Sequence, residues 1–139
     1  MYDRNFTIEA LPERIPEAIE MITQTGSVVG LTSRMCFEMQ VALAEALNNI
    51  VEHALPDNRK EKIFIDCQKN GNYFEINLCD RGNPISTNPD HRFPEHDEKG
   101  GRGWPIIFRW MDQVEYNHAR GWNHLTLKKA LPTIAGSGD

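Results

Sequence analysis

Apolar residues recur at intervals of three and four near the start of the chain, and this spacing predicts an amphipathic helix over residues 12–25. Pro12 suits the first turn of this helix, while Gly26 and Gly30 predict a break after it. The residues of the expected apolar face are Ile15, Ala18, Ile19 and Ile22.

A second and longer helix is predicted to begin after the N-cap signal at Thr32 and Ser33 and to continue to about Ala54. We expect Cys36 and Met39 on this helix to be packing residues. The stripe that we expect it to bury consists of Phe37, Val41, Ala44, Leu47, Ile50, Val51 and Ala54.

Alternation of apolar and polar residues indicates strands, and turn residues join them in pairs. Asn70 and Gly71 form a strong hairpin signal, and a second turn is expected near Arg120 and Gly121. The predicted strands are residues 6–10, 62–68, 73–79, 114–117 and 122–128, with a short helix over residues 104–111.

Residues 83–99 contain three prolines and several charges and follow no period. A long loop of this kind in a compact domain is usually functional, so we expect a mobile lid over an active site. The order of elements then predicts a two-layer α/β (α+β) sandwich with a mixed, mostly antiparallel sheet and helices on one face. The whole chain, residues 1–139, is predicted to form a single domain.

Composition narrows the function classes. The net charge of −5 argues against direct binding of nucleic acid, which normally requires a basic patch. No apolar run approaches the roughly 18 residues of a membrane span, and we expect no membrane association. The three cysteines are widely spaced, which fits reduced thiols and a cytoplasmic location better than a zinc site or disulfides.

Glu45 and Asn49 lie four residues apart within the second predicted helix, so they project from one face, one turn apart. A carboxylate and a carboxamide placed in this way can share a hydrated Mg²⁺, which binds oxygen ligands alongside phosphates. A lone helical Glu is usually only solvated. Two successive Asn residues, Asn48 and Asn49, cost helix propensity without a packing gain, and such exceptions occur mainly at functional sites.

Two further motifs follow. Asp80 and Gly82 come at the end of an apolar strand, where a buried carboxylate could accept a hydrogen bond from the amine of adenine and a glycine lets the backbone approach the base. Residues 99–103, with Lys99, Gly100, Gly101, Arg102 and Gly103, precede a predicted helix and could bind phosphates through backbone N–H groups and positive charge. Alone, each motif is an ordinary turn or glycine loop.

The order of these motifs resembles the N, G1 and G2 boxes of the GHKL ATPase superfamily. Residues 104–116 are similar to the stretch that follows the G2 box there, and the whole chain resembles the RsbW-like serine kinases that act as anti-sigma factors. This resemblance implies a Bergerat-type fold that binds ATP and Mg²⁺ beneath a mobile lid.

The resemblance also implies roles for single residues. Glu45 would be the general base, Asn49 would hold Mg²⁺ with Glu45 through water, and Asp80 would bind adenine. Ile85, in the run from Asn83, resembles the anti-sigma branch. Trp104 departs from the family pattern and would either cover the nucleotide or only pack.

Asn123 is a second departure, because the family often has a Thr at this position that supports the adenine-binding Asp through a water. An Asn could still hold such a water. The role of His53, at the end of the second predicted helix, stays open.

The resemblance finally implies a partner-switching module. A sigma factor would be held inactive, and a STAS-domain anti-sigma-factor antagonist would be phosphorylated on Ser or Thr; a homodimer is possible. One alternative is a histidine-kinase catalytic domain, which would need a phosphoacceptor helix pair that this chain has no room for. Another is a non-catalytic module that uses nucleotide only to switch the binding of a partner.

Overall fold

The computed structural model describes residues 3–54, 61–84 and 103–133. A short 3-10 turn, η1 (Pro12–Arg14), precedes the first helix, and a π-helical segment, η2 (Ile50–Ala54), follows the second. The other elements in chain order are β1 (Asp3–Glu9), α1 (Ile15–Val29), α2 (Ser33–Asn49), β2 (Lys62–Asn70), β3 (Tyr73–Asp80), α3 (Gly103–Trp110), β4 (Gln113–Ala119) and β5 (Trp122–Ala130).

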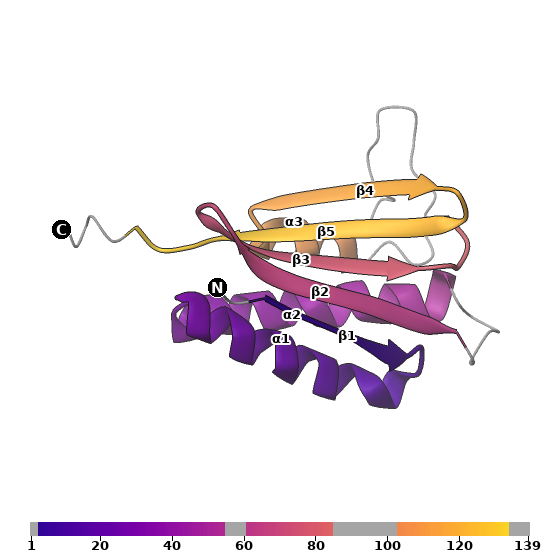
Figure 1. Cartoon of the computed structure of the whole chain (residues 1–139), viewed down its shortest axis with the longest axis horizontal. Helices are drawn as coiled ribbons and strands as arrows, with labels where there is room; N and C mark the ends of the chain where they lie inside the picture. The colour runs from indigo at the N-terminus through magenta and orange to yellow at the C-terminus, as the bar shows by residue number, and fades with distance from the viewer. Residues whose placement is uncertain (1–2, 55–60, 85–102, 134–139) are drawn as a thin grey trace.

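The described strands form one sheet in the order β1-β2-β3-β5-β4, and all four pairings are antiparallel. The helices cover one face of this sheet (Figure 1). The predicted two-layer sandwich with helices on one face is therefore confirmed. Both hairpin turns are also confirmed, since Asn70 pairs with Tyr73 and Ala119 with Trp122.

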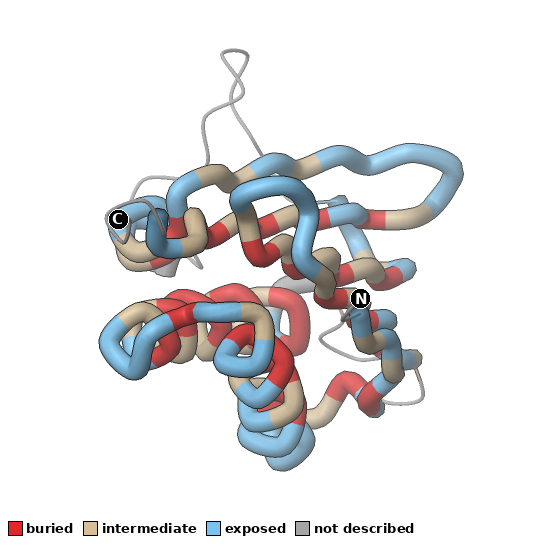
Figure 2. Tube along the Cα trace, turned by 60° about the vertical axis from the view of Figure 1, so that its left-hand side comes forward, coloured by how far each residue is buried: buried red, intermediate tan, exposed pale blue. Residues whose placement is uncertain are grey.

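The core lies between the helices and the sheet, where the buried positions of both layers face each other (Figure 2). β3 shows the alternation clearly, because Phe74, Ile76 and Leu78 are fully buried while the residues between them are only partly covered. The same alternation carries Asp80, the next residue in this register, to the helix side of the sheet.

The stripe predicted for α2 is partly wrong. Leu47, Ile50 and Val51 are buried, but Phe37 is 66% exposed, and Val41 and Ala44 are only half-buried. The side chain of Ala54 lies outside the described residues. The face that α2 buries instead consists of Cys36, Met39, Ala42, Leu43, Ala46 and Leu47.

The buried face of α2 combines small residues with large ones. Ala42 and Ala46 are completely buried, and small side chains allow neighbouring elements to pack closely against a helix. The predicted stripe followed Phe37 and Val41, which lie on a neighbouring side of the helix, and left out Leu43, which the structure buries completely. The packing roles expected for Cys36 and Met39 are confirmed by their burial.

The predicted break at Gly26 is also wrong, because α1 continues through Gly26 to Val29 and ends at Gly30, whose φ is 125°. Gly26 is buried beneath Leu31 and Phe74: a Cβ atom there would lie 2.8 Å from Leu31 Cδ1 and 3.1 Å from Phe74 Cε2. This glycine therefore permits a close contact between the helix and the core instead of ending the helix.

The start of α2 agrees with the prediction, since Thr32 Oγ1 accepts a hydrogen bond of 3.1 Å from the backbone N–H of Met35. The helical path also reaches Ala54 as expected, but Ile50–Ala54 adopts π-helical geometry. Such segments are rare and often occur at functional sites.

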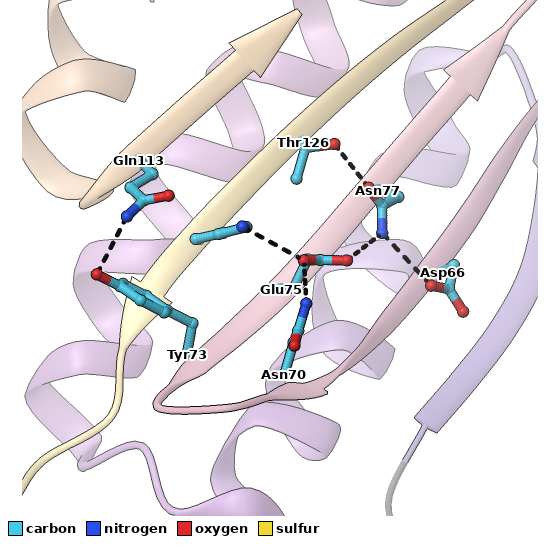
Figure 3. A network of polar contacts seen from close by, with 8 residues as sticks. Asp66, Asn70, Tyr73, Glu75, Asn77, Gln113 and Thr126 are labelled. Carbon is cyan, nitrogen blue, oxygen red and sulfur yellow. Dashed lines mark hydrogen bonds and ion pairs between the residues drawn. The ribbon is translucent and has the colours of Figure 1, made fainter.

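The sheet face away from the helices carries a polar network (Figure 3). Glu75 accepts hydrogen bonds of 2.9 Å from both Asn70 and Asn77, and Thr126 donates to Asn77 Oδ1 across 2.7 Å. The hydrogen bonds to Glu75, from Asn77 first, lower the pKa of its carboxyl group. Within the described segments, no helix is both long enough and apolar enough to span a membrane.

Candidate functional site

Three chain segments that carry predicted site residues end or begin at the same end of the molecule. The C-terminal end of α2, the C-terminal end of β3 and the beginning of β5 lie together there (Figure 1). The fold therefore gathers Asn49, Asp80 and Asn123 from distant parts of the sequence into one region. The family resemblance implied that the residue at position 123 supports Asp80. The structure places the two residues directly opposite each other in the pairing of β3 with β5.

Glu45 and Asn49 occupy the last turns of α2, one turn apart, and both are half-buried. Asn49 Nδ2 is buried and makes no hydrogen bond within the described part of the chain. A buried amide donor without a partner costs free energy and is rare in native structures. It fits an oxygen acceptor supplied by a ligand, and a phosphate group has acceptor oxygens only.

The change to π-helical geometry begins at Ile50, directly after Asn49. Ile50 and Val51 remain buried, so the helix keeps its core contacts although its hydrogen-bond spacing changes. The segment thus alters the helix at the residue whose amide lacks a partner, which marks this part of α2 as a candidate ligand site.

Asp80 is a buried carboxylate, with only 2% of its surface exposed. Its Oδ1 accepts a hydrogen bond of 2.8 Å from the backbone N–H of Gly82, two residues further along the chain. This contact between an Asp side chain and the backbone is an Asx-turn. Burial raises the pKa of Asp80, and the hydrogen bonds from Asn123 and Gly82 partly offset this rise. Both bonds go to Oδ1, which leaves Oδ2 as the oxygen available to a ligand among the contacts of the described residues.

Asn123 contacts Asp80 directly: its Nδ2 donates to Asp80 Oδ1 across 2.9 Å. The water that we considered as a bridge is not needed for this contact, because the Asn amide reaches the carboxylate itself. Asn123 Oδ1 in turn accepts hydrogen bonds from Tyr116 and His118 of β4.

The sequence analysis missed Tyr116 and His118 as site residues. The signal that could have identified them is the second hairpin, whose turn at Arg120 and Gly121 places His118 directly opposite Asn123. In an antiparallel pair, directly opposed side chains lie on the same face of the sheet.

The helix α3 runs back from this end of the molecule. Its last carbonyl, that of Trp110, accepts a hydrogen bond from Lys129, whose strand partner Phe74 lies near the far end of β3. α3 spans Gly103–Trp110, roughly 10 Å along its axis, and its C-terminal end leads into the start of β4, so the helix begins on the Asp80 side of Trp110 (Figure 1). This direction points the helix N-terminus, which favours anions, toward the candidate site.

Trp104 is 97% buried within the core, which identifies it as a packing residue. Several predicted site residues lie outside the described residues: Ile85, Lys99, Gly100, Gly101 and Arg102. Residues 85–99 of the predicted lid lie there too, and the side chain of His53 is also not described.

No group of three or more His, Cys, Asp or Glu side chains that could hold a metal ion occurs in the part of the chain that the structure describes. Glu45 and Asn49 nevertheless suit Mg²⁺ bound together with a nucleotide, because this ion keeps several waters and takes few protein ligands.

The histidine kinase-like ATPase domain family matches residues 8–129, which is most of the chain. The chain belongs to this family. Its fold and the order of its motifs agree with the resemblance to the GHKL superfamily. Its relatives include an RsbW serine-protein kinase and an anti-sigma F factor. An ATPase domain of this type is expected to bind ATP.

Two curated relatives illustrate the similarity. The chain is 28% identical to the serine/threonine-protein kinase BtrW of Bordetella bronchiseptica, over 69% of this chain and 71% of BtrW. It is 29% identical to the serine-protein kinase RsbW of Oceanobacillus iheyensis, over 82% of this chain and 78% of that protein.

Solved structures support the fold alone. The structure of the RsbU and RsbW domains of a Mycobacterium tuberculosis protein matches 94% of this chain with a TM-score of 0.69 and 16% identity. The match covers 33% of that longer chain. A blue-light activated histidine kinase of Erythrobacter litoralis matches 86% of this chain and 40% of its own, with a TM-score of 0.59 and 15% identity.

Proposed function

We propose that this chain is an ATP- and Mg²⁺-dependent protein serine kinase that also serves as an anti-sigma factor in a partner-switching module. The observation that carries the proposal is the buried, unpaired Nδ2 of Asn49, one helical turn from the carboxylate of Glu45. The names of BtrW, RsbW and an anti-sigma F factor among the relatives support the kinase and anti-sigma roles.

Adenine is the base that Asp80 would select. Its Oδ1 is held by two donors, so Oδ2 can accept the hydrogen bond that the exocyclic amine of adenine donates. Guanine has a carbonyl in place of this amine and would face the carboxylate with a second acceptor. The buried position of Asp80 makes such a mismatch costly.

Glu45 would act as the general base in transfer to a serine. The serine oxygen attacks the γ-phosphorus, its proton passes to the Glu45 carboxylate, and the bond between the γ-phosphorus and the bridging oxygen of ADP breaks. Proton transfer to a positioned carboxylate typically contributes about 10²–10⁴-fold to the rate. Bound Mg²⁺ would supply neutralisation of the phosphate charge.

The substrate in this proposal is a STAS-domain antagonist, and the second partner is a sigma factor. A phosphate on the antagonist would weaken its binding through added charge and the cost of burying it. The antagonist would then dissociate, and the kinase would be free to hold the sigma factor.

Radiolabelled ATP and a STAS-domain protein from the same genome test this proposal. Wild type should transfer label to a serine or threonine, whereas Glu45→Ala should transfer none while still forming the complex. Glu20→Ala, which removes an exposed carboxylate of α1, is the control and should transfer at the wild-type rate. Transfer by Glu45→Ala near the wild-type rate would refute the assignment of the base.

Tight binding of the STAS protein by the wild type without any transfer would instead indicate the non-catalytic module. Purification of partners from the native cell addresses the sigma factor separately. We expect this purification to recover a sigma factor. The unphosphorylated antagonist should displace that sigma factor from the kinase.

A further inference from the structure

The amide group of Asn123 is a buried hub at the end of the sheet. Its Nδ2 lies 2.9 Å from Asp80 Oδ1, 3.0 Å from the backbone oxygen of Asn83 and 3.2 Å from that of Gly82. The amide has two N–H groups and three acceptors within reach, so one hydrogen is shared between two acceptor oxygens. The amide fixes the Asp80 carboxylate and the backbone that follows β3 at the same time.

The other end of this amide is equally engaged. Asn123 Oδ1 accepts a hydrogen bond of 2.6 Å from the hydroxyl of Tyr116 and lies 2.9 Å from His118 Nδ1. A carboxamide oxygen only accepts hydrogen bonds, so His118 must carry its proton on Nδ1. Both side chains come from β4, where Tyr116 and His118 share the face of the sheet that carries Asn123.

We propose that Tyr116 and His118 are positioning residues that lock the orientation of the Asn123 amide and, through it, set the preference of Asp80 for adenine. This inference rests on the proposed function, because it concerns the same nucleotide site. The preference for adenine would then depend on Asp80 of β3, Asn123 of β5, and Tyr116 and His118 of β4, and not on Asp80 alone.

The physical reason is the near-symmetry of a carboxamide. Rotation of the Asn123 amide by half a turn would exchange Nδ2 and Oδ1 with little change in shape. The rotated amide would place its oxygen against Asp80 Oδ1 and two backbone oxygens, and would deprive all three of a donor. In the observed orientation Oδ1 accepts from Tyr116 and His118. The rotated NH₂ group would require Tyr116 to turn its hydroxyl proton away and His118 to move its proton to Nε2, and both changes oppose the rotation.

A threonine at this position would supply one hydroxyl donor and could not serve the three acceptors that Asn123 Nδ2 contacts. The extra donors from β4 are needed only because an amide, unlike a hydroxyl, can present the wrong atom. Asn123 and the two residues that support it, Tyr116 and His118, therefore act together.

The first test is the tautomer of His118 in the protein without nucleotide. Nitrogen-15 NMR of the imidazole should show the proton on Nδ1 in the neutral ring, and Asn123→Ala should shift the population toward Nε2. A wild-type ring protonated only on Nε2 would refute the inference, because Asn123 Oδ1 could not then be the partner.

The second test is the ratio of ATP to GTP affinity, measured by calorimetry with magnesium. The double variant Tyr116→Phe with His118→Ala should reduce the preference for ATP by roughly tenfold, the effect of one lost hydrogen bond. His118→Asn, in which the amide can replace the Nδ1 donor, should restore much of it in the Tyr116→Phe background. His124→Ala is the control, since His124 is exposed on the opposite face.

The two failures are distinguishable. Equal binding of ATP and GTP by the wild type would overturn the proposed function itself. A wild-type preference for ATP that persists unchanged in the double variant would overturn only the role of Tyr116 and His118. Thermal unfolding of each variant shows that the fold has been kept.

Discussion

Lys129 of β5 donates a hydrogen bond of 2.9 Å to Glu38 of α2, and the ammonium group also contacts the last carbonyl of α3 at Trp110. The Lys129 side chain is only 8% exposed. This single ammonium group thus joins the sheet to two helices and holds the C-terminal end of α3, whose N-terminus points toward the candidate site.

Lys129→Met should lower the free energy of unfolding by about 1–3 kcal/mol, because Glu38 and the Trp110 carbonyl would lose a donor. Urea unfolding measures the change. Lys128→Met is the matched control, since Lys128 lies 3.7 Å from Glu75 on the open face of the sheet and should contribute about 0–1 kcal/mol. Equal losses in both variants would contradict the prediction.

The same pair predicts a dependence of stability on pH. The hydrogen bond from Lys129 lowers the pKa of Glu38 below its ordinary value of 4.5. The stabilisation is therefore complete above pH 4.5 and is lost as the pH falls through the lower pKa of the folded protein. The difference in urea midpoint between wild type and Glu38→Gln should shrink as the pH falls below 4.5. A constant difference would exclude this linkage.

Gly26→Ala should destabilise the protein although alanine favours helices. The new methyl group would lie 2.8 Å from Leu31 Cδ1 and 3.1 Å from the Phe74 ring, and overpacking of this kind costs about 1–3 kcal/mol. Ser27→Ala, at the next and exposed position of α1, should be neutral or slightly stabilising. Thermal unfolding distinguishes the two, and a stabilised Gly26→Ala would show that Leu31 moves aside freely.

Asp80→Asn should remove the preference for adenine. Gly82 and Asn123 both donate to Oδ1, so the new amide would turn its oxygen toward them and present its NH₂ group where Oδ2 was. The donor would then face the amine of adenine, at a cost of about 1–3 kcal/mol. Calorimetry with ATP and GTP gives the result, with Asp66→Asn on the other sheet face as control. Retained selectivity in Asp80→Asn would exclude this carboxylate as the base reader.

Asn49→Ala should separate stability from ligand binding. The variant removes a buried donor without a partner, so the free protein should unfold at the same or a higher temperature than wild type. Binding of ATP with magnesium should fall sharply, and the thermal shift that the nucleotide produces should be lost. Asn48→Ala should keep that shift. Normal ATP binding by Asn49→Ala across a magnesium titration would refute the role of this amide.

The sequence alone determined the elements and their order. Alternation in residues 62–79, the turn at Gly71 and the capping residue Thr32 act over a few neighbouring positions, so local spacing is enough to identify them. The same holds for the pairing of Glu45 with Asn49, because helical periodicity fixes their relation without any tertiary contact.

Tertiary packing decided the rest. Which face of α2 is buried depended on the elements that pack against it, and Gly26 lies inside α1, where its missing side chain leaves room for Leu31 and Phe74. The donors from β4 lie close to Asn123 in sequence and follow from the local hairpin, but Asp80 is 43 residues away and reaches Asn123 only through the pairing of β3 with β5. Partners brought together by the pairing of two strands that are distant in sequence leave no local pattern, so only the folded chain shows that Asn123 holds Asp80 directly.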